Sequence, residues 1–166
     1  DVIVEAARLL DDGFRFRIVG SGQTMDEFRE RAEGIDGKRI ELSGNVPENE
    51  LPGLIAGADT VLGVFGTTPK TGMVIPNKVY QSMACGRPVV TADTPSVREI
   101  FTPGKHLVCV PPGDAVLLAG ALKRLRDDAQ FASSVAENGG RLVREQFNPE
   151  KVAGRLLDIL ATEGGR

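Results

Sequence analysis

The 166-residue sequence has little of several residue types, and each shortage removes a class of function. It has two cysteines, one histidine and no tryptophan, with no His/Cys/carboxylate cluster and no Asp-x-Asp pair, so neither a disulfide framework nor a metal site is expected. A net charge of −3 leaves no basic surplus for nucleic acid. No apolar run approaches the roughly 18 residues of a membrane span, and no signal peptide is visible. These features predict a reduced, cytoplasmic, metal-independent protein.

The order of apolar runs predicts an α/β fold. Short Val/Ile/Leu runs alternate with helical patterns, which is typical of a parallel sheet covered by helices on both faces. We therefore expect one doubly wound, Rossmann-like domain, whose ligand binds at the carboxyl ends of the strands. The last helix, opened by Asn148-Pro149, carries an apolar stripe at Val152, Leu156, Ile159 and Leu160. The strands are expected at residues 15–20, 39–44, 60–65, 88–92 and 106–110.

Residues 63–90 are the most informative stretch, because a strand leads there through a Gly/Pro/Thr loop into a short helix. Pro76 suits the first helical position, and Gly86 suits a left-handed cap that Pro88 follows. Spacing places Asn77, Lys78 and Gln81 together near the start of the helix, and it places Val79, Met83 and Ala84 on another, buried face beside Tyr80. The free N–H groups of the helix, its dipole and the adjacent lysine indicate a phosphate site.

A second candidate is the turn Gly20-Ser21-Gly22, which follows a strand and precedes a charged helix expected over residues 24–32. It resembles the start of a dinucleotide fingerprint, with Glu41 as a candidate ribose ligand. However, Met25 stands where the third glycine is needed, and Glu41 lies inside a strand. An NAD-type site and a plain tight turn both remain open at this point.

The segment from Pro76 to Val90 resembles the E-A-M-A-x-G-x-P-V-V segment of family 4 retaining glycosyltransferases with the GT-B fold. It is most similar to the branch whose helix opens Pro-x-Lys-x-x-Glu. The resemblance continues along the chain, since residues 18–22 resemble the I-V-G-x-G loop, residues 44–46 resemble G-x-V and residues 110–114 resemble V-P-P-G-D. This similarity implies the carboxy-terminal, donor-nucleotide half of a GT-B enzyme over residues 1–162, with a tail at 163–166.

The resemblance also implies roles for individual residues. Gln81 falls on the second glutamate of the E-x7-E pair, which holds the ribose, and Lys78 would meet the diphosphate, so these two are the candidate catalytic residues. The implied donor is a UDP- or GDP-linked sugar, transferred with retention and without a cofactor. The remaining nucleotide-binding candidates line the cleft, meet the base or flank the diphosphate: Gly20, Ser21, Gly22, Val46, Lys70, Pro76 and Asn77.

Three departures from the family pattern qualify these expectations. Gln81 lacks the charge of glutamate, and Met73 stands at the first glutamate of the pair. The first strand of the family domain and its R-x-x-x-K-G segment are absent before Asp1. We therefore expect a fragment that is inactive without an amino-terminal GT-B domain. A GT-B sugar-nucleotide 2-epimerase, a phosphorylase-like enzyme and a degenerate nucleotide-binding module are the alternatives, and a lipid-linked acceptor would bring peripheral association with the inner membrane face.

Overall fold

The computed structural model describes residues 2–22, 25–35, 37 and 39–163 and has an α/β architecture. Its paired strands run parallel, as the sequence predicts. They form two sheets, however, where the sequence predicts one, and no backbone hydrogen bond joins the two among the described residues. One sheet contains β1 (Phe16–Val19) and β2 (Ile40–Ser43). The other has the order β3-β4-β5 and contains β3 (Val61–Leu62), β4 (Val89–Ala92) and β5 (Val108–Val110).

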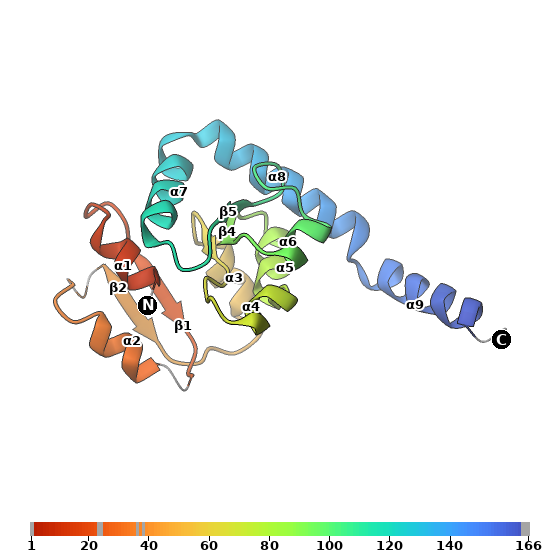
Figure 1. Ribbon diagram of the computed structural model, residues 1–166, viewed down its shortest axis with the longest axis horizontal. Coiled ribbons are helices and arrows are strands. Elements are labelled where there is room, and N and C mark those ends of the chain that lie inside the picture. The colour runs from red at the N-terminus through yellow and green to blue at the C-terminus, as the bar shows by residue number, and fades with distance from the viewer. Residues whose placement is uncertain (1, 23–24, 36, 38, 164–166) are drawn as a thin grey trace.

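Helices connect and cover these strands (Figure 1). They are α1 (Val2–Arg8), α2 (Met25–Arg31), α3 (Leu51–Ala56), α4 (Pro69–Met73), α5 (Asn77–Ala84), α6 (Pro95–Ile100), α7 (Ala115–Asp127), α8 (Ala129–Gln146) and α9 (Pro149–Glu163). Helix α4 corrects the sequence prediction of an irregular loop there, because Pro69 fits a first helical turn. The expected start of α2 at Thr24 lies outside the described residues. So does the expected tail, apart from Glu163, which ends α9.

Strand β4 shows how the helices are layered on the sheet. Successive side chains of a strand point to opposite faces, and Val89 and Val90 separate accordingly. Val90 joins a core cluster with residues of α1 and α7, whereas Val89 joins a second cluster with residues of α5, α6 and α8. All four residues of β4 are buried. The sheet therefore has helices on both faces, and the carboxyl ends of its strands remain available as a ligand edge.

Hydrogen bonds from two arginine side chains, one on each side, fix the end of α1 against the β1–β2 half. Arg39 Nη2 donates to the carbonyl oxygens of Ala7 and Leu10 at 2.7 and 2.8 Å, which satisfies acceptors left free at a helix carboxyl end. Arg8 of α1 in turn donates to the carbonyl oxygens of Arg31, the last residue of α2, and of Glu33 after it. Helix α1 also packs against α7, so it connects the two sheets through the helical layer.

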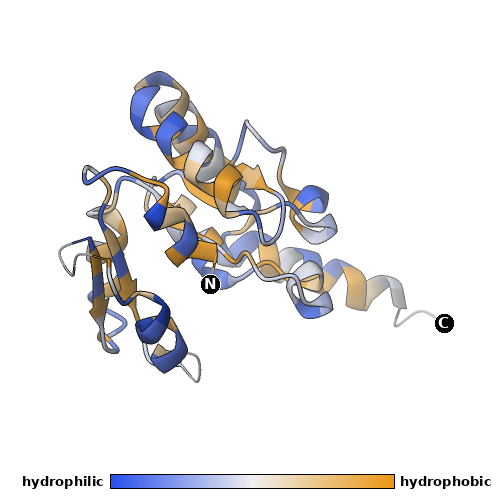
Figure 2. Cartoon of the chain, turned by 60° about the vertical axis from the view of Figure 1, so that its left-hand side comes forward, coloured by the Kyte–Doolittle hydropathy of each residue, from blue (hydrophilic) through white to orange (hydrophobic). Residues whose placement is uncertain are grey.

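Helix α9 extends away from the rest of the chain (Figure 1), and the hydropathy colouring shows hydrophobic residues along it (Figure 2). Its predicted stripe is present but uncovered, because Val152, Leu156, Ile159 and Leu160 are 51–60% exposed. Arg155 steadies its direction by donating to Gln146 Oε1 at 2.6 Å and by lying over the Phe147 ring. None of the helices in the described residues combines the length and apolar character needed to span a bilayer.

Candidate functional site

Helix α5 begins and ends as its sequence dictates. Pro76 has φ −63° and ψ 143°, so it is the capping residue before the helix and not its first helical residue. Gly86 has φ 71°, the left-handed conformation predicted for it. The N–H of Gly86 donates to Met83 O, and the N–H of Arg87 donates to Ser82 O, which together form a Schellman motif. The helix is therefore held at a fixed length between a proline and a glycine.

The two faces of α5 differ at one residue from the prediction. Val79 and Met83 are buried as expected, but Ala84 is exposed and Ser82 is buried. Ala84 lies seven residues after Asn77, which is close to two helical turns, so it shares the solvent face with Asn77. The hydroxyl of Ser82 is satisfied within the helix, because it donates to Lys78 O at 2.6 Å. The buried face of α5 thus contains a serine that requires no partner on another element.

An open pocket of about 310 Å³ lies beside the solvent face of α5. Asn77 and Gln81, one turn apart, contribute two amide side chains to its lining. Tyr80, Phe147 and Val152 supply the apolar part, and the ring centroids of Tyr80 and Phe147 are 5.1 Å apart. The structure therefore brings two of the predicted residues to one pocket, together with aromatic residues that the sequence analysis did not assign. Such a lining offers hydrogen bonds on one side and a flat apolar surface on the other.

Lys78 is the cationic residue of this helix start. Its side chain keeps an exposed surface, yet protein atoms surround the ammonium closely enough that desolvation lowers its pKa below the ordinary lysine value. Among the described residues, no carboxylate forms an ion pair with it. A partly desolvated ammonium without a counter-ion is stabilised by any anion that binds beside it. The first N–H groups of α5 point to the same end of the helix.

The Gly20 turn is joined to the loop after β2. Gly20 has φ 132°, a conformation that favours glycine, and its N–H donates to Ser43 O and Gly44 O at 3.2 and 3.3 Å. Ser21 Oγ donates to Asn45 Oδ1 at 3.1 Å, and both residues are exposed. The half-buried Val46 follows directly. The structure thus brings Gly20, Ser21 and the Asn45-Val46 segment together at the carboxyl ends of β1 and β2.

Glu41 does not behave as a ribose ligand of a dinucleotide site. It lies within β2, where it accepts a hydrogen bond from Arg17 on the neighbouring strand at 2.9 Å. The Arg17 guanidinium holds the pKa of this carboxyl below its usual value. With its carboxylate already paired across the ladder, Glu41 gives no support to the NAD-type alternative.

Lys70 and Met73 both lie in α4, the short helix missed by the sequence analysis. Lys70 is exposed and near the start of this helix. Met73, which stands at the first position of the family's glutamate pair, is 74% exposed and ends the helix. Thr71 Oγ1 donates to Gly66 O and Thr68 O, which holds the turn into α4. Neither residue lines the pocket beside α5.

The sequence analysis also missed a charged pair after β4. Arg98 donates from Nε and Nη2 to the two carboxylate oxygens of Asp93, at 2.6 and 2.5 Å, in a bidentate ion pair. Thr94 between them caps α6, because its Oγ1 accepts from the N–H of Val97. The spacing Asp-Thr-Pro before a helix was the available signal. The pair fixes a carboxylate at the same edge of the sheet.

The histidine and the half-buried Cys109 have structural explanations. Nδ1 of His106 accepts a hydrogen bond from the N–H of Thr102 at 3.0 Å, which closes the turn before β5. Burial and the nearby Asp93 raise the pKa of the Cys109 thiol to about 12, so it stays protonated. The described residues contain no group of three or more His, Cys, Asp or Glu side chains placed to hold a metal ion.

Relatives of the chain are bacterial glycosyltransferases. A putative colanic acid biosynthesis glycosyltransferase, WcaL, of Salmonella typhimurium is 30% identical over 97% of this chain and 41% of its own length. The phosphatidyl-myo-inositol mannosyltransferase of Mycobacterium leprae is 26% identical over 93% of this chain and 40% of its own length. The chain therefore spans about two fifths of the curated relatives it matches.

Solved structures share its fold at lower sequence identity. Anabaena Alr3699/HepE in complex with UDP-glucose superposes with a TM-score of 0.84 and 20% identity, over 97% of this chain and 44% of that chain. The C-terminal domain of the glycosyl transferase group 1 protein LpcC from Francisella tularensis has a TM-score of 0.72 and 20% identity, over 89% of this chain and 78% of that domain. The structural neighbours have the GT-B fold.

The comparison of the sequence with known families gives one match, described as "Glycosyl transferases group 1", and it extends over residues 1–128. This range contains both β-sheets, helix α5, the Gly20 turn and the Asp93–Arg98 ion pair. It covers well over half of the chain, and the chain therefore belongs to the glycosyl transferases group 1 family.

Proposed function

We propose that this chain is the donor-nucleotide half of a retaining GT-B glycosyltransferase, of the family 4 branch with Pro-x-Lys at the helix start. Its donor would be a UDP- or GDP-linked sugar. The observation that carries the proposal is Lys78 at the start of α5, whose ammonium forms no ion pair with a carboxylate of the described residues and whose pKa is lowered by desolvation. The family match and the fold shared with a UDP-glucose complex support the choice of a nucleotide sugar as the anion.

The diphosphate would be held by Lys78 and by the N–H groups at the start of α5, behind Pro76. One exposed helix terminus contributes only about 0.3–1 kcal/mol, whereas micromolar affinity corresponds to about −8 kcal/mol. Contacts to the ribose and base are therefore needed as well. The exposed Lys70, near the start of α4, would be a second cation for the same diphosphate.

The ribose contacts are assigned to Asn77 and Gln81, whose amides line one pocket. An amide oxygen accepts from a ribose hydroxyl, although without the extra strength of a charge-assisted bond. The base is assigned to the backbone around Val46, and the joined turn of Gly20, Ser21 and Gly22 would close the other side of the cleft. None of these contacts needs a metal ion.

In the transfer step, the bond between the anomeric carbon and the diphosphate oxygen breaks, and the acceptor oxygen bonds to that carbon on the same face. The leaving diphosphate keeps the bonding electron pair and takes up the proton that the acceptor hydroxyl loses, and Lys78 with the start of α5 would stabilise its charge. The acceptor residues are assigned to the rest of the polypeptide, since the chain spans about two fifths of its curated relatives. These 166 residues alone should bind nucleotide and transfer no sugar.

A second candidate, a nucleotide-binding module without chemistry, is favoured by two residues. The family pattern has a pair of glutamates at the positions of Met73 and Gln81. The exposed Met73 and the uncharged Gln81 therefore supply no carboxylate to the site. Titrating the complete polypeptide with nucleotides and assaying it for sugar transfer tests this candidate. Nucleotide binding without sugar transfer there would favour the module.

The donor site is tested by titrating the chain with UDP, GDP and ADP and recording the dissociation constants by calorimetry or NMR. Lys78→Ala should weaken binding of the preferred nucleotide about tenfold, because it removes a hydrogen bond to a charged group worth about 1.5–3 kcal/mol. Gln81→Glu should strengthen binding a few fold. Lys105→Ala is the matched control, since this exposed lysine precedes β5 at the opposite edge of the sheet and should leave affinity unchanged.

The pH dependence adds a further check of Lys78. Because desolvation lowers its pKa, the ammonium loses its proton at a lower pH than an ordinary lysine. Nucleotide affinity should therefore decline as the pH rises, before the range in which ordinary lysines titrate, and Lys78→Ala should abolish that decline. Unchanged affinity in Lys78→Ala at every pH would remove the donor-site assignment.

A further inference from the structure

The pocket beside α5 is lined by five residues, and none of them is charged. Lys78, which is proposed to meet the diphosphate, is not among them. Arg155 lies over Phe147, one of the lining residues, but its guanidinium is already engaged, because it donates to Gln146 Oε1 at 2.6 Å. Sites that recognise anions through side chains normally present a cation. The lining of this pocket therefore suits a neutral ligand.

Two of the lining residues offer free hydrogen-bonding groups. Asn77 and Gln81 are exposed and one helical turn apart, and their side chains have no hydrogen-bond partner in the part of the chain that the structure describes. An amide carries an acceptor oxygen and two N–H donors, so it can hold a hydroxyl group that donates or accepts. Cβ atoms at this spacing are about 5–6 Å apart, which lets both amides reach the hydroxyl groups of one ring.

The position of Tyr80 separates the pocket from the diphosphate end of the site. Tyr80 comes two residues after Lys78, so their side chains leave nearly opposite sides of α5, with Asn77 and Gln81 between them. The ribose proposed above lies on the Lys78 side of the two amides, because it is joined to the diphosphate. It leaves N–H donors of both amides unused. The side toward Tyr80 is therefore open to a second ring.

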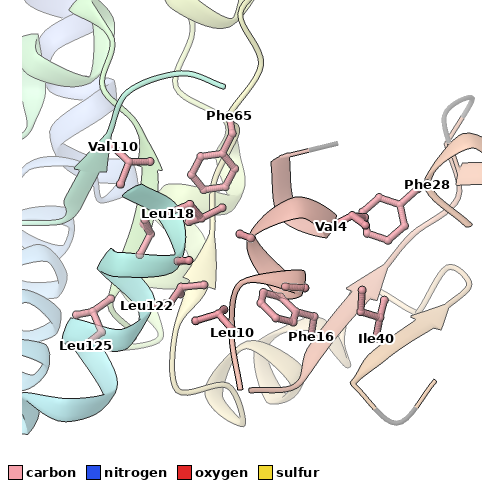
Figure 3. Close-up of a cluster of buried hydrophobic side chains, with 14 residues drawn as sticks. Val4, Leu10, Phe16, Phe28, Ile40, Phe65, Val110, Leu118, Leu122 and Leu125 are labelled. Carbon is pink, nitrogen blue, oxygen red and sulfur yellow. The ribbon is translucent and has the colours of Figure 1, made fainter. Parts of the chain in front are cut away.

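The apolar wall of the pocket contains two half-buried aromatic rings. Phe16 and Phe65 are buried in the larger core cluster, where Figure 3 shows them among the other members. Tyr80 and Phe147, by contrast, line the pocket, with their ring centroids 5.1 Å apart. The exposed Val152 extends this wall on α9. The face of an aromatic ring is electron-rich, so it attracts the weakly positive C–H groups of a ring that lies on it.

A pyranose sugar has the chemistry that this pocket requires. Its hydroxyl groups lie around the rim of the ring, whereas its C–H groups form apolar patches on the two faces. Amides on one side of the pocket and aromatic rings on the other match this division. A purely apolar ligand would leave both amides without partners, and an anion would find no cation in the lining.

The proposed transfer step indicates which sugar occupies the pocket. Because the donor reacts with retention, the acceptor oxygen approaches the anomeric carbon on the face that the diphosphate leaves. The acceptor therefore lies beside the diphosphate, which is assigned to the start of α5. The pocket opens along this same helix, from Asn77 to Gln81.

We infer that the pocket beside α5 is a saccharide subsite that takes a neutral pyranose ring of the acceptor. The ring lies against Tyr80, Phe147 and Val152, and its hydroxyl groups bind the amides of Asn77 and Gln81. This subsite rests on the proposed transferase function, and it adds a contact on this chain to the acceptor residues assigned to the rest of the polypeptide.

Titration with methyl glycosides, followed by NMR, tests the subsite. The methyl α-glycosides of glucose, galactose and mannose are added to the 166-residue chain, alone and with the nucleotide sugar that binds best at saturation. At least one glycoside should bind with a dissociation constant on the order of millimolar. It should shift the backbone amide signals of Tyr80, Gln81 and Val152, and its own C–H protons should move upfield through the aromatic ring currents. Its affinity should be the same with and without the nucleotide sugar.

Variants at the pocket wall locate the contact. Phe147→Leu keeps an apolar side chain but removes the flat ring, so it should weaken glycoside binding about fivefold and abolish the upfield shifts. Phe131→Leu is the matched control, because Phe131 is also half-buried beneath an arginine but does not line the pocket. On the exposed side of α9, where folding is not at risk, Val152→Ala should weaken binding about twofold, and Leu156→Ala should leave it unchanged.

Three results would overturn the inference. Unshifted signals at the pocket residues with every glycoside would show that the pocket holds no sugar. Competition between a glycoside and the nucleotide sugar at these residues would assign the pocket to the donor. Equal affinities of Phe147→Leu and Phe131→Leu would place the glycoside elsewhere on the chain. Nucleotide binding without glycoside binding would remove this subsite alone, whereas glycoside binding without nucleotide binding would remove the donor site and keep a saccharide site.

Discussion

Helices α8 and α9 follow one another along the chain, and both carry an apolar stripe at helical spacing. In α8 the stripe is covered: Val135 and Val143 are buried, and Gly139 lies against α5 and the turn before β5. In α9 the stripe is open, with Leu156 57% exposed. The spacing of apolar residues therefore identifies which face of a helix can pack. Whether another element covers that face depends on the rest of the fold.

The reason for the difference is visible at the contact between α8 and α5. Gly139 and Gly140 have no side chains, which allows the backbone of α8 to approach Met83 and the carbonyl of His106 closely. A Cβ built on Gly139 would be 2.5 Å from His106 O. Helix α9 begins after this contact ends, at Pro149. At Gly154, a Cβ would have no atom within 4 Å apart from the neighbouring residues and backbone of α9 itself.

The largest effect is expected from Gly139→Ala in α8. The new methyl group meets the backbone carbonyl of His106, which cannot rotate away, so α8 must shift from the turn before β5, and we expect the free energy of unfolding to fall by about 2 kcal/mol. Urea denaturation followed by circular dichroism measures this. Ala136→Gly in the same helix controls for helix propensity. An unchanged midpoint for Gly139→Ala would show that α8 does not pack against α5 as described.

A smaller effect of opposite sign is expected from Gly154→Ala in α9. The position is open, so the substitution adds no clash and removes the entropic cost of glycine in a helix, which stabilises by roughly 0.5–1 kcal/mol. Because α9 has few contacts, the gain should show mainly as increased helicity in circular dichroism. A loss of stability here would mean that α9 is packed against the rest of the chain, which would remove the contrast with α8.

The smallest effect is expected from Leu156→Ala. Substitutions of exposed residues usually change stability by less than about 0.5 kcal/mol, and this side chain is 57% exposed. The denaturation midpoint of the 166-residue chain should therefore stay within error of the unmodified chain. A decrease comparable to that of Gly139→Ala would indicate a contact for the α9 stripe in this chain.

Local signals predicted much of the fold correctly. Asp114 closes the segment that resembles V-P-P-G-D, and it caps α7, because its carboxylate accepts from the N–H of Leu117 at 2.8 Å. Gly86 was predicted to be left-handed, and it is. These positions were readable because capping depends on a few consecutive residues. Helix α4 was missed because its five residues, with a glycine and a proline, have the composition of a loop.

Features that depend on distant residues were harder to predict. The division of the sheet follows from hydrogen bonds between strands far apart in sequence, and no local pattern reports it. Ala84 was predicted on the buried face but is exposed, because alanine is compatible with either face. Ser82 is buried, and its hydroxyl is satisfied by donating to Lys78 O. In the site, spacing grouped Asn77, Lys78 and Gln81 near the start of the helix; Asn77 and Gln81 line one pocket, whereas Lys78 does not line it. Phe147 and Val152 could be assigned to that pocket only from the structure.

The Asp93–Arg98 pair has a consequence for how a charged ligand would approach. The protein carries a net charge of −3, so its average field repels anions at long range. Asp93 places a carboxylate after β4, but the bidentate guanidinium of Arg98 cancels most of its field within a few ångströms. The ammonium of Lys78, to which no carboxylate is ion-paired in the part of the chain that the structure describes, then remains the dominant charge at the helix start. An acidic protein can in this way maintain a short-range positive potential, whose attraction for a nucleotide would weaken as salt is added.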